Sequence, residues 1–351
     1  MKKLRVGILA ATGTVGQRFI QLLANHPWFE VSAVAASGNS AGKKYAEATR
    51  WMLETPMPES VASMTVQACK PGFDCDFVLS SLPTEIAEEV ELEFAKAGLP
   101  VISNASSNRM KADVPLLIPE INPDHLAAVE AQKPRIGGKG FIVTNPNCTT
   151  IGLVFPMAAI HRAFGLEAVS VVTMQAISGA GYPGVASMDI LDNILPAIGR
   201  GGEDEKVETE PLKLLGQWTN GKFVDAAIRM SAMTHRVMVR DGHMEAASVK
   251  LKTKASREEV EAAIRNFRSP IDELRLPSAP HPAIIVETDI ERPQPRLDRD
   301  RGNGMAVVCG PILPCGVLDY KFRVCSHNTI RGAAGAAILN AELLYKKGMI
   351  G

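Results

Sequence analysis

The sequence lacks the features that mark membrane proteins and nucleic-acid-binding proteins. Its 38 basic and 38 acidic side chains cancel, so no net charge attracts a polyanion. The longest apolar run, residues 148–160, is too short to span a bilayer. We therefore expect a cytoplasmic protein with no nucleic-acid partner and no membrane partner.

The sequence also has few cysteines, and their spacing excludes two common uses. The six cysteines show neither the C-x-x-C spacing of a zinc or redox site nor the density of a disulfide scaffold. We expect no bound metal, and we expect most of the thiols to be reduced and buried. A cysteine proposed as a nucleophile therefore needs support from its neighbours.

Strand and helix patterns alternate through the first part of the chain. Residues 4–9 form an apolar run that ends in ATGTVG, and residues 14–25 then show helical spacing. A helical pattern at 84–97 is accompanied by further apolar runs at 31–36, 77–81, 100–103 and 141–144. This alternation predicts an α/β fold with a doubly wound, Rossmann-type parallel sheet.

The pattern changes after residue 148. Residues 168–177 and 243–252 read as longer strands, and the second alternates apolar and polar residues, as in an antiparallel sheet with one open face. A polar loop is expected at 289–304, and helices at 184–198, 204–216 and 256–267. We predict a second, α+β domain at 148–327. The first domain would contain 1–147 and, because the last helix returns to it, 328–351.

The turn after the first strand has the form of a dinucleotide-binding turn. Ala10, Gly13 and Gly16 occupy the three small-residue positions of G-x-x-G-x-x-G. Such residues let backbone N–H groups approach a pyrophosphate at the start of a helix. A plain strand-to-helix turn is the alternative, and the position at the end of the first strand favours the nucleotide.

The residues after the second strand favour NADP over NAD. An NAD enzyme places Asp or Glu near Ala36 to bind the ribose, whereas the segment 37–44 carries two serines, two lysines and no acid. Hydroxyl and ammonium groups suit the 2′-phosphate of NADP. A solvated loop is the alternative.

Cys148 is the best candidate for a nucleophile. Residues 145–150 read Asn-Pro-Asn-Cys-Thr-Thr, and an apolar helical pattern begins directly after them. A thiol at a helix N-terminus meets the positive end of the dipole and free N–H groups, which lower its pKa and favour the thiolate. A structural cysteine at the start of a buried helix is the alternative.

Six segments of the chain, in order, resemble those of aspartate-semialdehyde dehydrogenases. They are SNASSNRM (103–110), TNPNCTTIG (144–152), QAISGAGYPG (175–184), GGEDEK (201–206), RVMVRDGH (236–243) and NTIRGAAGAAILNAELL (328–344). The resemblance covers nearly the whole chain. It is greatest to the archaeal and fungal branch, as SAGKKY and RPQPRLDRDRGNGMAV also indicate.

The resemblance implies a reaction, a cofactor and an assembly. The reaction is the NADPH-dependent reduction of L-aspartyl 4-phosphate to L-aspartate 4-semialdehyde and phosphate, in lysine, threonine and methionine biosynthesis. Cys148 would carry the acyl group as a thioester. The first domain would bind NADP, and the second would be the catalytic and dimerisation domain of a homodimer or homotetramer. The other partners would be the small-molecule substrate and inorganic phosphate.

The resemblance also implies roles for individual residues. His243 matches the general acid/base, and Gln175 matches the residue that holds the reacting acyl group or the substrate carboxylate. Substrate binding is expected from Arg109, Asn147, Glu203, Lys206 and Arg236, of which Arg236 would pair with the α-carboxylate. Cofactor binding is expected from Ala11, Thr12, Gly13, Thr14, Val15, Ser37, Ser40, Lys43, Ser81, Leu82, Ser178, Gly179 and Asn328.

Departures from the family pattern leave alternatives open. Ala10 replaces the usual first glycine of the turn, Met238 replaces the usual Pro, and Thr234-His235 replace the usual Cys-Asn. The nearest alternative is a relative with the same thioester chemistry, such as malonyl-CoA reductase or N-acetyl-glutamyl-phosphate reductase. Arg236 favours the amino-acid phosphate.

Two further alternatives remain, one for the role of the Glu203–Lys206 pair and one for the class of protein. The Glu203–Lys206 pair also favours the amino-acid phosphate, but an ordinary (i, i+3) surface pair would have the same spacing. A non-catalytic NADP-binding regulatory protein would keep the glycine turn, but it would have no reason to retain Cys148 and His243 together with Gln175 and Arg236.

Overall fold

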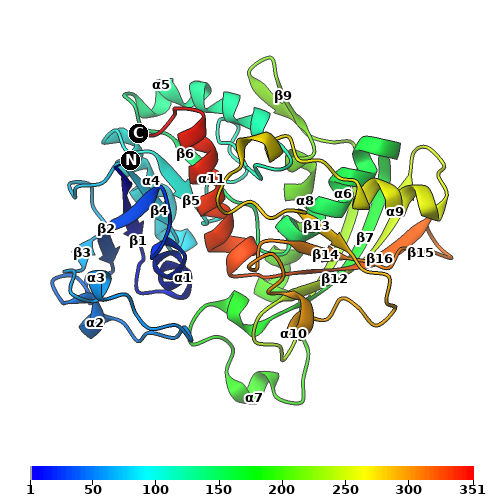
Figure 1. Ribbon diagram of the computed structural model, residues 1–351, viewed down its shortest axis with the longest axis horizontal. Helices are drawn as coiled ribbons and strands as arrows, with labels where there is room; N and C mark the ends of the chain where they lie inside the picture. Colours follow the sequence, from blue (N-terminus) through cyan, green and yellow to red (C-terminus); the bar gives the residue numbers. More distant parts are fainter. Residues whose placement is uncertain (1) are drawn as a thin grey trace.

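The structure is a computed structural model that describes residues 2–351. Two sheets lie beside each other, one from each part of the chain (Figure 1). The first has six parallel strands in the order β3 (Gln67–Ala68), β2 (Phe29–Ala36), β1 (Leu4–Leu9), β4 (Phe77–Ser80), β5 (Val101–Ser103) and β6 (Ile142–Thr144). This is the strand order of a dinucleotide-binding sheet, so the predicted Rossmann-type fold is confirmed.

Helices cover both faces of the first sheet. Successive strand residues point to opposite faces, so Val6 and Ile8 of β1 pack in one core and Leu9 in another. The first core contains side chains of α1 (Thr14–Leu23) and α11 (Gly335–Lys346), and the second contains side chains of α4 (Thr84–Lys96). The last helix therefore packs against the first sheet, and its residues 335–344 are buried on every side.

The second sheet has eight strands and is mixed. Its order is β13 (Ile284–Val286), β14 (Val307–Cys309), β16 (Tyr320–Ser326), β12 (His243–Leu251), β7 (Leu166–Gln175), β11 (Arg229–Arg236) and β8 (Leu195–Pro196), with β15 (Leu313–Pro314) paired to β16. The expected antiparallel pairing holds for β7, β12 and β16. The strand β11 was not predicted, and it pairs with β7 in parallel because the chain crosses over between them through α8 (Gly202–Leu214).

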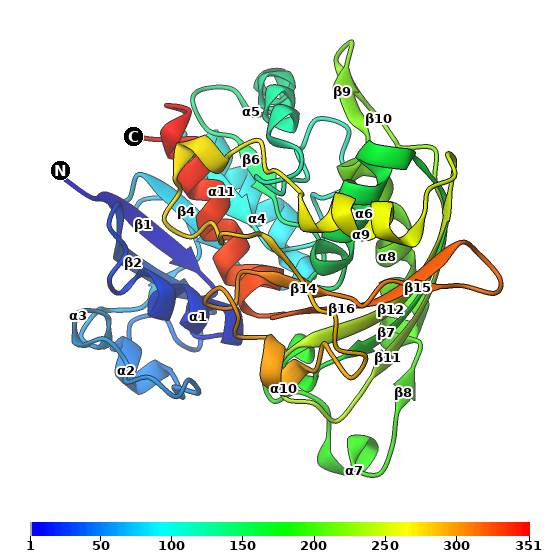
Figure 2. The same cartoon turned by 45° about the vertical axis from the view of Figure 1, so that its right-hand side comes forward.

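One face of the second sheet carries helices and the other is open. The helices α6 (Thr150–Phe164), α8 and α9 (Arg257–Arg265) lie on the same side (Figure 2). The outward side chains Val172 of β7 and Met233 of β11 are exposed. At the start of α9, Ser256 Oγ accepts from the backbone N–H of Glu259 at 3.2 Å, so the predicted capping box is present.

The helix predicted at 184–198 is wrong for most of its length. The regular elements of that segment are α7 (Ser187–Ile190) and the short strand β8, because Asp192 and Ala197 adopt positive φ. Such residues cannot continue a right-handed helix.

The remaining elements are short. The predicted loop at 289–304 contains only the one-turn helix α10 (Pro295–Asp298). The others are α2 (Tyr45–Ala48), α3 (Glu59–Ala62), α5 (Lys133–Ile136), a hairpin of β9 (Gln217–Thr219) and β10 (Lys222–Val224), 3₁₀ turns at Pro123–Gln132, Ile177–Ala180, Ile198–Gly201 and Asp272–Leu274, and a π-helical turn at Ile330–Ala334.

Three features are absent from residues 2–351. No helix is long and apolar enough to cross a membrane. No group of three or more His, Cys, Asp or Glu side chains is arranged to hold a metal ion. No disulfide bond joins any of the six cysteines, which are all free thiols.

Candidate active site

A cavity of about 750 Å³ lies between the two sheets. Its walls include the residues that follow β1, β4, β5 and β6, and it therefore opens at the carboxyl ends of the parallel strands. This is where open α/β sheets bind their ligands, at the point where the strand order reverses. The second sheet contributes residues 178–182 together with Glu203 and Lys206 of α8.

The glycine turn fits a dinucleotide. Thr12, Gly13, Thr14 and Val15 line the cavity, and Gly13 begins α1 without a side-chain cap, so the first N–H groups of the helix have no capping acceptor. At Gly16 a Cβ would stand 2.4 Å from the Ala10 carbonyl oxygen, and only glycine allows this close packing of helix on strand.

Two residues of the turn behave differently from the sequence expectation. Ala10 has a φ of +58°, in the left-handed region, which explains why a glycine suits this position. Ala11, expected to contact the cofactor, is fully buried behind the turn and does not line the cavity. Its carbonyl oxygen accepts from the Tyr45 hydroxyl at 2.8 Å.

The loop expected to bind the 2′-phosphate follows β2. Ser37 and Lys43 are exposed, and Ser40 is half-buried with its backbone N–H donating to the Ser37 carbonyl at 2.9 Å. The three residues lie outside the cavity wall, on the surface of the loop. Their hydroxyl and ammonium groups are donors that suit a phosphate, and no carboxylate stands among them.

The structure brings Cys148 and His243 together. Cys148 lies between β6 and α6, and its Sγ is 3.2 Å from Nε2 of His243, the first residue of β12. His243 is fully buried, and its Nδ1 accepts the backbone N–H of Ala176 at 3.0 Å. These two contacts fix the orientation of the imidazole against the thiol.

The low thiol pKa stays a prediction, because the surroundings of Cys148 oppose it in two ways. Asn147 Oδ1 accepts the N–H groups of Thr149 at 2.8 Å and Thr150 at 3.3 Å, so the free N–H groups expected beside the thiol are already bonded. Burial raises the pKa of Cys148 to about 12, and the charge of Glu203 acts in the same direction.

Arg236 and Gln175 end neighbouring strands close to Cys148 and His243. They are partners in the register of β11 and β7, and both are buried. Arg236 Nη1 donates to the Ala176 carbonyl at 2.8 Å, while Gln175 Oε1 has no partner among the described residues. A Cβ on Gly179 would stand 2.7 Å from Arg236 Nη1, so a larger residue there would displace the guanidinium.

One face of α8 carries three charged residues of the site. Glu203 Oε1 accepts from Asn147 Nδ2 at 2.6 Å, and Glu203 Oε2 lies 3.2 Å from Lys206 Nζ. Glu210 accepts from Arg109 Nη1 at 2.9 Å and from the backbone N–H of Asn147 at 2.6 Å. Sequence reasoning missed Glu210, although its spacing of i+7 from Glu203 places both on one helix face.

The remaining expected contacts meet at the inner end of the cavity. Asn328 Nδ2 donates to Ser178 Oγ at 2.8 Å, and Asn328 Oδ1 accepts the Gly242 N–H at 2.8 Å, so the protein itself holds this amide. Ser178, Gly179 and Asn328 line the cavity, as do Ser81 and Leu82 after β4.

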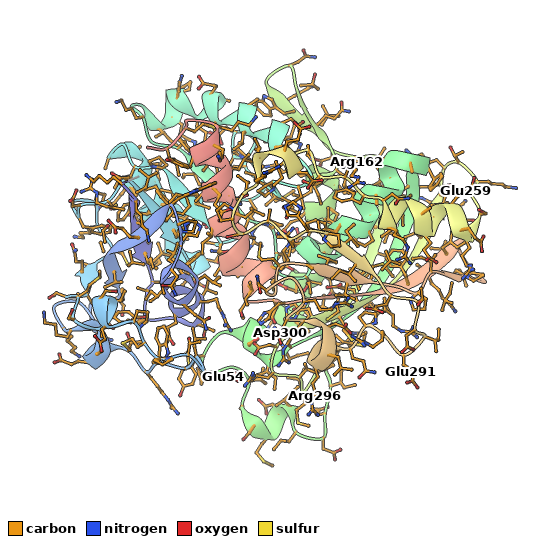
Figure 3. The ribbon with its side chains drawn as sticks, in the orientation of Figure 1. Glu54, Arg162, Glu259, Glu291, Arg296 and Asp300 are labelled. Carbon is orange, nitrogen blue, oxygen red and sulfur yellow. The ribbon has the colours of Figure 1, made fainter. Side chains whose placement is uncertain are left out.

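The departures from the family pattern lie outside this cavity. Met238 is exposed and lines a second cavity that includes Glu54 and Asp300, which Figure 3 marks at the junction of the two halves. The Thr234 N–H donates to Asp204 Oδ1 at 2.9 Å on the buried side of β11. The Cys148 wall of the first cavity is therefore formed without either residue.

Comparison with known proteins identifies the family. Residues 5–129 match the model "Semialdehyde dehydrogenase, NAD binding domain", and residues 157–331 match "Semialdehyde dehydrogenase, dimerisation domain". The chain belongs to the aspartate-semialdehyde dehydrogenase family. The enzyme class and function predicted from the sequence, an oxidoreductase of aldehydes in this family, are confirmed. The alternatives, malonyl-CoA reductase and N-acetyl-glutamyl-phosphate reductase, are not favoured.

Relatives from archaea and fungi match over nearly their full lengths. The aspartate-semialdehyde dehydrogenase of Archaeoglobus fulgidus is 51% identical over 98% of this chain and 99% of the relative. That of Aspergillus fumigatus is 46% identical over 99% of each chain. The crystal structure of the Candida albicans enzyme with NADP superposes with a TM-score of 0.91 at 44% identity, covering 99% of this chain and 100% of that one. The predicted branch is confirmed.

Proposed function

We propose that this chain catalyses the NADPH-dependent reduction of L-aspartyl 4-phosphate to L-aspartate 4-semialdehyde and inorganic phosphate. The observation that carries the proposal is the Cys148–His243 contact of 3.2 Å at the nucleotide cavity. A nucleophile beside a nicotinamide site is the arrangement that thioester chemistry requires. The donor set around the glycine turn and the acid-free loop after β2 support NADP as the cofactor.

Cys148 binds the acyl group covalently and later releases it. Its Sγ attacks the C4 carbonyl carbon, the C–S bond forms, and the bond to the phosphate oxygen breaks, which leaves a thioester. NADPH, when bound, supplies the hydride that reduces this thioester. As the aldehyde C=O forms again, the C–S bond breaks and the electron pair returns to sulfur. His243 Nε2 lies close enough to stabilise charge on sulfur or on the carbonyl oxygen.

The charged residues around the pair recognise the rest of the substrate. Arg236 presents a planar guanidinium suited to the α-carboxylate, and Glu203 offers a carboxylate for the ammonium. Lys206 and Arg109 are the cations available for the phosphate, and both line the cavity. Gln175, the register partner of Arg236, has a buried Oε1 without a partner among the described residues and would hold the acyl group or the substrate carboxylate.

The dimerisation-domain match supports an oligomer, for which we propose a homodimer or homotetramer. The open face of the second sheet, with Val172 and Met233 exposed, is suited to such contact. We also propose that the cofactor domain is 1–147 with 328–351 and that the catalytic domain is 148–327, because β1 and α11 share one core. The expected cytoplasmic location stays a prediction.

The test is the phosphate-dependent reduction of NADP by the purified protein with L-aspartate 4-semialdehyde, beside an assay of malonyl-CoA reduction. Turnover of the semialdehyde alone supports the proposal, and turnover of malonyl-CoA alone contradicts it. Cys148→Ala should remove the activity, because no other thiol lines the cavity within residues 2–351. More than a trace of remaining activity would contradict the thioester mechanism.

A further inference from the structure

The imidazole of His243 has two polar contacts of opposite kinds. The backbone N–H of Ala176 points at Nδ1, 3.0 Å away, and an N–H can only donate. Nδ1 must therefore offer a lone pair, which leaves the single proton of a neutral imidazole on Nε2. Nε2 then donates to Cys148 Sγ across 3.2 Å.

We infer that His243 is held as a neutral imidazole with its proton on Nε2, and that the backbone N–H of Ala176 is the positioning group that holds it so. The inference rests on the proposed function, in which Cys148 is the nucleophile. It assigns the pair a resting state different from the thiolate–imidazolium pair expected where a histidine takes the proton of a cysteine.

The backbone around Ala176 is fixed from both sides. Ala176 is fully buried, its carbonyl oxygen accepts from Arg236 Nη1 at 2.8 Å, and its N–H donates to His243. It follows β7 directly and precedes the 3₁₀ turn Ile177–Ala180. A peptide bonded in this way cannot rotate to accept a proton from Nδ1 without breaking both contacts.

The charges that face the pair disfavour imidazolium. A Cβ placed on Gly179 would lie 2.7 Å from Arg236 Nη1 and 3.2 Å from His243 Nε2. The guanidinium is therefore close to the imidazole ring. Burial lowers the pKa of His243 well below its usual value, and Arg236 and then His327 act in the same direction. The other charged groups acting on the thiol are Glu203, Arg109 and Lys206.

The assigned tautomer gives His243 a defined task. Nε2–H can donate a hydrogen bond to the sulfur when it carries negative charge and to the substrate oxygen when charge develops there. In this resting state Nδ1 faces the Ala176 N–H, so the side of the ring toward Cys148 presents a donor, and not an acceptor for the thiol proton.

Nitrogen-15 NMR of the histidine-labelled full chain at neutral pH tests the tautomer directly. We expect a protonated Nε2 and an unprotonated Nδ1 for His243, with the signals assigned by their loss in His243→Gln. An imidazolium, or a proton on Nδ1, would overturn the inference. The measurement uses the free protein, so it is independent of which acyl substrate is turned over, and failure of the proposed reaction would leave its result unchanged.

A backbone change tests the role of Ala176. L-lactate in place of Ala176 replaces the N–H by an ester oxygen without adding bulk, and we expect the single tautomer to be lost and kcat to fall about tenfold. L-lactate in place of Ala232 is the matched control, since that N–H also donates to a side chain, Glu208 Oε1 at 2.9 Å, on β11. An unchanged tautomer in the Ala176 ester would overturn the inference.

The pH dependence of thiol alkylation gives a second readout. With a neutral pair, the rate of Cys148 alkylation by iodoacetamide should follow one alkaline ionisation, with no plateau of reactivity on the acid side. A thiolate–imidazolium pair would instead show a plateau of reactivity on the acid side that His243→Gln removes. That outcome would also overturn the inference.

Discussion

The backbone of Gly332 lies directly against Cys148. A Cβ on Gly332 would stand 2.8 Å from the Cβ and 3.0 Å from the Cα of Cys148, closer than such atoms approach. Gly332 belongs to the π-helical turn Ile330–Ala334 that leads into α11. The candidate nucleophile is therefore positioned by a segment from the far end of the sequence as well as by the start of α6.

Gly332→Ala should lower kcat strongly. The added methyl group must displace the backbone of Cys148, and a shift of about 1 Å at a reacting atom costs about 100-fold in rate. Steady-state kinetics would show the loss in kcat with little change in the KM for NADP. Gly316→Ala is the control, because a Cβ there meets nothing within 4 Å. Equal kcat values for the two variants would contradict the positioning role.

Ala10→Gly should stabilise the protein. Ala10 has a φ of +58°, and the left-handed conformation costs a residue with a Cβ about 1–2 kcal/mol, partly offset by the greater entropy of an unfolded glycine. We expect a net gain of up to about 1 kcal/mol in the free energy of unfolding, measured with urea. Ala97→Gly, at an exposed position with a φ of −72°, should destabilise instead. A loss of stability in Ala10→Gly would show that the strain is not relieved.

The parts of the fold set by local sequence patterns were predictable. The apolar runs and the turn around Gly13 predicted the parallel sheet, and the capping box of Ser256 and Glu259 predicted the start of α9. The segment 184–198 was mispredicted because its helical spacing competes with positive φ values near Ala197, which the sequence pattern does not reveal.

The site could be predicted only in part. The family motifs named the residue types, and the structure brings Cys148, His243 and Arg236 together. Contacts made by the backbone, such as the Ala176 N–H, leave no trace in side-chain identity. The engagement of the N–H groups after Cys148 by Asn147 Oδ1 and the burial that raises the pKa of the thiol depend on the folded structure, so the sequence pattern does not reveal them.

Lys43→Glu should impair NADP much more than NAD. Lys43 is exposed on the acid-free loop after β2, where a 2′-phosphate would be bound, and a carboxylate there would repel it. The ratio of kcat/KM for NADP to that for NAD should fall about tenfold or more. Lys139→Glu makes the same charge change on a distant exposed loop and should leave the ratio unchanged. Equal losses with both cofactors would remove Lys43 from the 2′-phosphate site.

Glu245→Met should stabilise the protein, increasingly so as pH rises. Glu245 is fully buried on β12, and neither carboxylate oxygen has a partner among the described residues. Burial raises its pKa well above 4.5, so above that pH the folded state binds more protons than the unfolded state and wild-type stability falls as pH increases. Removing the unpaired group should add about 1–3 kcal/mol at neutral pH.

Urea unfolding of both proteins from acidic to mildly alkaline pH would check this sign. The gain should shrink as the pH approaches 4.5, because Glu245 is then protonated in the unfolded state too. Glu89→Met, at an exposed position on α4, should show no such trend. A gain that stayed constant across the range would mean that the carboxyl is ionised in the folded protein.

Glu210→Gln should raise the KM for phosphate more than the KM for NADP. Glu210 holds the Arg109 guanidinium at 2.9 Å and the Asn147 N–H at 2.6 Å, and it is buried. Removing its charge leaves the Arg109 guanidinium without its charged partner, with only the Asn104 carbonyl still accepting from Nη2 at 2.6 Å, which costs up to about 3–5 kcal/mol and allows the guanidinium to reorient. The KM for phosphate should rise and the KM for NADP should stay close to wild type. Glu205→Gln, at an exposed position on the same helix, serves as control, and matching phosphate KM values for the two variants would contradict the role of Glu210.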